Sequence, residues 1–154
     1  GLGFYLPNET IYTDTDDFED YTLTIYYVGC YVGCADGGQN ILSIYSHKLD
    51  GTIISEDSIE FLMGQQQNSD LLELLKETDK IYLYGAKNDS NNACLVVYPK
   101  GSECYFEIYI SGESFDDFEI EDDDDGEITV YEKGRFFTEE TYNAFVDTLQ
   151  YLGE

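Results

Sequence analysis

The chain has 154 residues, of which 42% are hydrophobic and 16% aromatic, and a chain of this size and composition can bury a core as one globular domain. Its 33 Asp and Glu residues outnumber its 7 Lys and Arg residues, so the formal net charge is −26. This charge repels nucleic acid and anionic membranes and favours a basic protein partner. The apolar runs are too short to span a membrane, and residues 1–154 are predicted to form a single domain.

Alternating apolar and polar residues predict strands over much of the chain. In residues 21–28, YTLTIYYV, every second residue points to the same face of a strand. Residues 41–48 and 52–61 flank Asp50-Gly51, a dipeptide typical of tight hairpin turns. These two segments are therefore predicted to be paired strands.

Two helices are predicted farther along the chain. The first covers about residues 68–78, where Asn68 or Ser69 provides an N-cap and four leucines give a wide apolar side. The second covers about residues 138–152, where apolar residues recur at intervals of three and four. Further strands are predicted at 80–86, 94–99, 104–112 and 127–133. Strands that do not alternate with helices predict an α+β fold, with a predominantly antiparallel sheet and both helices packed on it.

Tyrosines and carboxylates alternate with apolar residues in these later strands, so one face of the sheet is predicted to carry both. Tyrosine is common at interfaces because its ring buries a large area and keeps a polar tip, and carboxylates steer a basic partner. We therefore predict a partner-binding surface formed by Tyr82, Tyr84, Glu103, Tyr105, Glu107, Tyr109, Asp116, Asp117, Glu119 and Tyr131. The alternative is that the helices cover this face, or that tyrosine serves there only as a good strand former.

Residues 115–132, FDDFEIEDDDDGEITVYE, contain ten carboxylates around one glycine. A register that starts at Glu121 places Asp123, Asp125 and Glu132 at ligand positions of a twelve-residue calcium loop. Glu121 replaces the usual Asp at the first position, and strands rather than helices are predicted on both sides. A calcium site at these three residues is therefore the alternative use of the stretch, and no other cofactor is expected.

The remaining reactive side chains carry no recognisable catalytic or zinc-binding pattern. Cys30, Cys34, Cys94 and Cys104 lack the histidines or the second closely spaced cysteine pair of a zinc site. Cys94 and Cys104 lie on neighbouring predicted strands and can form a disulfide if their registers match, whereas the alternative is that all four are small buried apolar residues. His47 is the single histidine, and no nucleophile, phosphate-loop or dinucleotide motif occurs. The chain is therefore not expected to be an enzyme.

Taken together, the acidic charge and the tyrosine-bearing strands predict a protein-binding module. We expect an inhibitor or immunity-type protein that neutralises a basic toxin or nucleic-acid-processing enzyme. The alternative is a calcium-binding domain of the cell envelope. The first residue is Gly1 rather than methionine, which favours an extracytoplasmic location, secreted or membrane-anchored, over a cytoplasmic one.

Overall fold

A computed structural model describes residues 1–6, 11–28, 40–67, 69–89, 92–111, 119–122, 128–131 and 139–153. Within these residues the strands are β1 (Leu2–Gly3), β2 (Ile11–Asp17), β3 (Tyr21–Val28), β4 (Asn40–Lys48), β5 (Glu73–Glu77), β6 (Ile81–Asp89), β7 (Asn92–Pro99), β8 (Cys104–Ser111), β9 (Glu119–Asp122), β10 (Ile128–Tyr131) and β11 (Gln150–Tyr151). The helices are α1 (Glu56–Gly64), the 3₁₀ turn η1 (Ser69–Leu71) and α2 (Glu139–Thr148).

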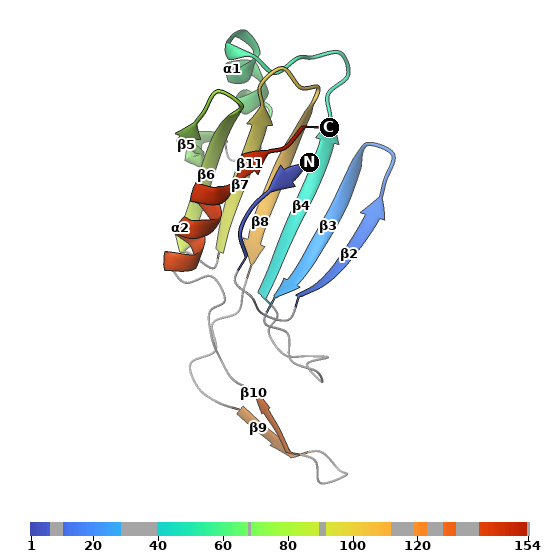
Figure 1. Ribbon diagram of the computed structural model, residues 1–154, viewed down its shortest axis with the longest axis vertical. Coiled ribbons are helices and arrows are strands. Elements are labelled where there is room, and N and C mark those ends of the chain that lie inside the picture. Colours follow the sequence, from blue (N-terminus) through green and yellow to red (C-terminus); the bar gives the residue numbers. More distant parts are fainter. Residues whose placement is uncertain are drawn as a thin grey trace.

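The main sheet is antiparallel and has the strand order β2-β3-β4-β8-β7-β6-β5 among the described residues (Figure 1). Two short ribbons, β1 with β11 and β9 with β10, are also antiparallel. This architecture confirms the predicted α+β class with a predominantly antiparallel sheet and two helices. The strands predicted at 21–28, 80–86, 94–99, 104–112 and 127–133 correspond to β3, β6, β7, β8 and β10.

Each face of the sheet supports its own buried cluster. On one face, α2 and the N-terminal segment pack over the central strands (Figure 1), and Phe145, Leu95 and Ile108 are fully buried there. On the opposite face, α1 packs over one end of β6 and β7, where Ile54 and Tyr98 are fully buried. Strand β7 is therefore covered on both sides, as its nearly continuous apolar sequence ACLVVYP requires.

The first predicted helix is in the wrong place. Residues 68–78 were expected to be helical, but η1 and the edge strand β5 occupy this segment. The leucine spacing fits a helix, yet the backbone of β5 hydrogen-bonds along β6, and Leu71 and Leu74 stay 65% and 50% exposed. The backbone hydrogen bonds that this segment makes along the edge of β6 thus outweigh its local preference for a helix.

The missing helix is α1, in a segment where a strand was predicted. Ser55 precedes it, and the Ser55 backbone N–H donates to the Ser58 side-chain oxygen at 2.9 Å. Glu56 and Asp57 then place negative charge at the positive end of the helix. The turn at Gly51 exists, with φ of +72°, but β4 pairs with β3 and β8 rather than with residues 52–61.

The end of the second helix needs correction, and the disulfide alternative for Cys94 and Cys104 is excluded. Helix α2 ends at Thr148, and Gln150–Tyr151 pairs with β1 instead of continuing the helix to residue 152. Cys94 lies opposite Tyr109 in the β7–β8 register, whereas Cys104 lies on the other face, so both thiols are unpaired. Cys30 and Cys34 lie outside the described residues. No described helix is long and apolar enough to cross a membrane.

Candidate functional site

One face of the sheet carries a row of aromatic side chains that crosses several strands. The antiparallel register places Tyr21 opposite His47, and His47 opposite Tyr105. Because side chains alternate between the faces of a strand, every second residue joins this row. We name it the aromatic face, and its members are Tyr21, Tyr45, His47, Tyr98, Tyr105, Glu107 and Tyr109.

The rings of the aromatic face contact one another in sequence. The Tyr105 ring stacks on His47, with centroids 4.7 Å apart, and on Tyr98 at 5.5 Å. The Tyr45 ring meets the edge of Tyr109 at 5.7 Å. At the outer end, Phe18 stacks on Tyr21 at 4.6 Å. Such contacts fix the rings relative to one another and add to the stability gained from their burial.

Glu107 lies in the middle of this face and has two polar neighbours. The Tyr109 hydroxyl donates to Glu107 Oε2 at 3.1 Å, and His47 Nε2 lies 3.5 Å from the same oxygen. The contact with His47 lowers the pKa of the Glu107 carboxyl, although partial burial opposes the shift. Burial and the negative charge of Glu107 in turn raise the pKa of the Tyr109 hydroxyl. The face therefore presents a carboxylate beside a neutral phenol.

Only part of the aromatic face is covered. Helix α1 packs over Tyr82 and Tyr98, which are 7% and 0% exposed. Toward β4 and β3 the rings are half-buried, and Tyr109 is 40% exposed. Among the described helices, α1 covers the β6–β7 end of this face, α2 packs on the opposite face, and neither covers the β3–β4–β8 end.

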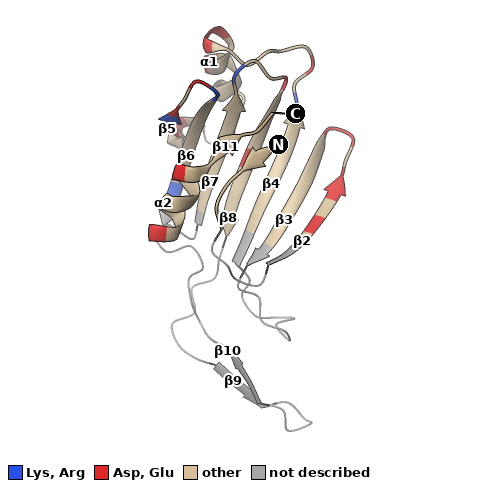
Figure 2. Cartoon of the chain, in the orientation of Figure 1, with Lys and Arg blue, Asp and Glu red and all other residues tan. Residues whose placement is uncertain are grey.

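Acidic residues border the open end of the face. The β2–β3 hairpin contributes five carboxylates in seven residues, and its described side chains are exposed: Asp14, Asp16, Asp17, Glu19 and Asp20. Figure 2 shows Asp and Glu residues in red on β2 and on the turn that follows it. Neither strand of the hairpin contains Lys or Arg. The exposed Phe18 lies within this acidic turn, so an apolar ring and negative charge occur together.

The predicted binding residues lie in different parts of the structure, and Tyr82 is buried under α1. Tyr105, Glu107 and Tyr109 lie together on the open part of the face, with Tyr84 half-buried near its covered end. Glu103 is exposed just before β8. Glu119 and Tyr131 are paired in the backbone register of the separate β9–β10 ribbon. Asp116 and Asp117 lie outside the described residues.

The prediction omitted Tyr21, Tyr45 and His47, which belong to the same face. Alternation in residues 21–28 and 41–48 already placed these side chains on one side of their strands. The order of the strands was the missing information, because β4 pairs with β8 across a long sequence separation.

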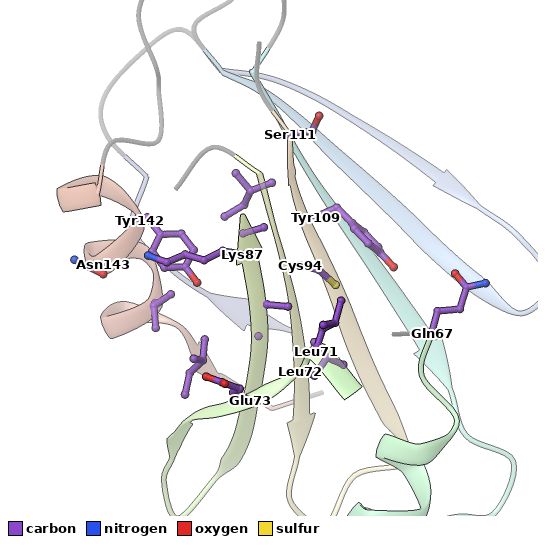
Figure 3. A pocket seen from close by; sticks show the side chains of 16 residues that line it. Gln67, Leu71, Leu72, Glu73, Lys87, Cys94, Tyr109, Ser111, Tyr142 and Asn143 are labelled. Atoms are coloured by element: carbon purple, nitrogen blue, oxygen red, sulfur yellow. The ribbon is translucent and has the colours of Figure 1, made fainter. Parts of the chain in front are cut away.

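A groove of about 840 Å³ follows the β6 edge at the other end of the sheet. Figure 3 shows Tyr142 and Asn143 of α2 at one side of it and Leu71, Leu72 and Cys94 at another. Lys87 lines the groove but is engaged, since its ammonium contacts Glu139 at 3.0 Å and lies over the Tyr142 ring. Tyr109 lines both this groove and the aromatic face.

The calcium ligands proposed from sequence, Asp123, Asp125 and Glu132, lie outside the described residues. Among the side chains that the structure describes, no group of three or more His, Cys, Asp or Glu residues is arranged to hold a metal ion.

Neither the known protein families, nor the curated proteins, nor the solved structures include a match to this chain.

Proposed function

We propose that this chain is an acidic protein-binding module that occludes a basic partner, such as a toxin or a nucleic-acid-processing enzyme. The observation that carries the proposal is the continuous row of ring contacts from Phe18 to Tyr98, open toward β3 and β4 and bordered by exposed carboxylates. Rigid aromatic anchors dominate the free energy of binding at many interfaces.

The charge of the hairpin supports the choice of partner. Exposed carboxylates at Asp14, Asp16, Glu19 and Asp20 attract a basic surface before contact is made. The tyrosines then supply apolar area that loses little conformational entropy on binding, since each ring has few rotatable bonds and already contacts its neighbours. Steering and anchoring are thus assigned to different residues of one surface.

Affinity capture from cells of the source organism tests this proposal. The immobilised protein is expected to retain a basic protein at low salt and to release it as sodium chloride is added. A Tyr109→Ser variant should weaken that complex about tenfold or more, because it removes an exposed anchor. Tyr5→Ser is the matched control, since Tyr5 is also exposed, at 54%, but lies in the N-terminal segment.

A double variant separates long-range attraction by the carboxylates from anchoring by the tyrosines. Asp14→Asn combined with Asp16→Asn should slow association and leave dissociation nearly unchanged. Capture of only neutral or acidic proteins, or equal retention by the Tyr109→Ser protein, would count against the proposal.

A further inference from the structure

A pocket of about 420 Å³ opens beside the aromatic face, between the β2–β3 turn, the end of β4 and the region of α1. Glu19 and Asp20 line it from the turn, and Asp50 lines it from the segment after β4. Lys48 also lines the pocket, so three carboxylates stand against one ammonium. This imbalance favours a cationic ligand.

Polar groups also line the deeper part of the pocket. Gln66 lines it beside Tyr98 and Tyr105 and interacts with the hydroxyls of both rings. His47 lines the pocket as well, and its Nε2 atom lies 3.5 Å from Glu107 Oε2. The deep end of the pocket therefore offers polar atoms beside aromatic rings.

The remaining wall of the pocket is apolar and aromatic. Phe61 is 66% exposed at the pocket, and Leu62 lies behind it on the same helix. A single apolar side chain of this size on the surface is unremarkable, but here it stands next to three carboxylates. Flat apolar walls combined with hydrogen-bond acceptors match a planar cation that is only weakly hydrated.

We propose that this pocket receives an arginine side chain of the basic partner. The inference rests on the proposed function and adds to it the chemical group that the module recognises. The carboxylates and amides lie on separate elements around the pocket. A guanidinium carries five N–H donors in a fixed fork and can reach several such acceptors at once, whereas a lysine ammonium acts as a point charge.

Titration with N-acetyl-arginine methylamide tests the pocket without the partner. We expect saturable NMR shifts of the Phe61, His47 and Tyr105 resonances at millimolar ligand. The citrulline analogue has the same shape without the charge and should give no saturable shift. Equal responses to the arginine and citrulline analogues, or to the arginine and lysine analogues, would overturn the assignment.

Matched variants distinguish binding of the arginine analogue in the pocket from non-specific attraction of a cation to an acidic protein. Glu19→Gln with Asp20→Asn should weaken the arginine analogue about tenfold, as expected for lost charge-assisted hydrogen bonds. Asp14→Asn with Asp16→Asn removes the same charge from the same hairpin but outside the pocket, and should have little effect. Lys48→Gln should tighten binding. Equal weakening by the two double variants would reduce the effect to bulk charge and contradict the proposal.

This titration and the capture experiment test the two proposals separately. If a basic partner is retained but the arginine analogue does not bind, the protein-binding function stands and the arginine pocket is wrong. If the analogue binds in the pocket but no basic protein is retained, the pocket recognises guanidinium and the proposed function is wrong.

Discussion

At the scale of single residues, Glu107 is the most informative carboxylate of the aromatic face. It is half-buried among tyrosines, where a charged group loses hydration. Its contacts with His47 and the Tyr109 hydroxyl offset that loss and favour the ionised form. The residue therefore links the protonation of the face to the stability of the fold.

The lowered pKa of Glu107 gives a pH dependence of known sign. Above the ordinary glutamate pKa of 4.5, the carboxylate is ionised in both states and its contacts stabilise the folded protein. As the pH falls below that value, the unfolded chain binds the proton first, so this stability is lost as the pH passes through the folded pKa. The stability difference between wild type and Glu107→Gln should therefore become smaller as the pH falls below 4.5.

Urea denaturation at each pH measures this difference. Glu103→Gln removes the same charge from the exposed end of β8 and serves as the control. A difference between wild type and Glu107→Gln that stays constant with pH would contradict the assignment.

At Gly85, leucine side chains from the two neighbouring strands lie close to the β6 backbone. A Cβ atom there would lie 2.5 Å from Leu75 Cδ1 and 2.7 Å from Leu95 Cδ2. Leu75 is 43% exposed and can move, but Leu95 is fully buried. Gly85→Ala should therefore destabilise the protein by about 1–3 kcal/mol through overpacking.

Thermal and urea unfolding of Gly85→Ala test this expectation against Gly64→Ala. A Cβ at Gly64 meets nothing within 4 Å, and alanine suits a helix better than glycine. Gly64→Ala should thus be neutral or stabilising. A neutral Gly85→Ala would mean that Leu95 repacks without cost.

At the scale of secondary-structure elements, β5 connects the edge of the sheet to α2. Its Lys76 ammonium donates to the carbonyl oxygens of Asp147 at 2.8 Å, Leu149 at 3.2 Å and Val146 at 3.4 Å. These carbonyls belong to the end of the helix, which lacks partners within the helix and carries partial negative charge. A side chain from a strand thus caps a helix that contains no basic residue in its last turn.

Loss of this cap should weaken the packing of α2. Lys76→Met keeps most of the aliphatic chain and removes the ammonium, so we expect a loss of about 1–2 kcal/mol in the free energy of unfolding. Lys80→Met, at an exposed turn position, is the control. Circular dichroism during urea unfolding measures both variants, and equal midpoints for the two would argue against the cap.

The same element explains where sequence reasoning failed. The spacing of Leu71, Leu72, Leu74 and Leu75 is helical, and nothing local indicates that β6 needs a neighbour at this edge. By contrast, the N-cap at Ser55 and the acidic first turn of α1 were readable signals, which the adjacent Asp50-Gly51 turn obscured by suggesting a hairpin. Strands β3 and β8 were predicted well because period-two alternation there reflects burial on defined faces.

At the scale of the whole molecule, the net charge of −26 opposes the compact state. Three of the described lysines, Lys76, Lys87 and Lys100, have partners away from the β2–β3 hairpin. Lys48 lines the pocket beside Glu19 and Asp20, so one ammonium stands near the five carboxylates of the hairpin. Sodium chloride should therefore raise the melting temperature by a few degrees as screening shortens the range of repulsion to about 10 Å at 0.1 M.

Calcium chloride at matched ionic strength is the informative comparison for this melt. An equal rise in both salts is expected for relief of repulsion alone. A larger rise with calcium, absent in an Asp123→Asn and Asp125→Asn variant, would instead indicate a metal site in the acidic stretch. A melting temperature that does not change with salt would contradict the claim that charge repulsion destabilises the folded protein.

The candidate site was only partly predictable because it depends on the order of the strands in the whole sheet. Alternation identified Tyr105, Glu107 and Tyr109 as neighbours on one strand. It could not pair β4 with β8 or β3 with β4, because strand order depends on contacts between distant parts of the chain. His47 was therefore left out of the predicted binding surface, although it stacks at the centre of the face.

The double covering of β7 has a consequence for local opening of the protein. Val96, Val97 and Tyr98 are at most 1% exposed, whereas the described side chains of β2 are exposed. Amide hydrogen exchange should thus be slowest in β7 and fastest in the β2–β3 hairpin, with a gradient of protection across one continuous sheet. A partner bound at the open end would slow amide exchange in the β2–β3 hairpin, where protection in the free protein is low. The residues that the partner covers could therefore be identified by their increase in protection.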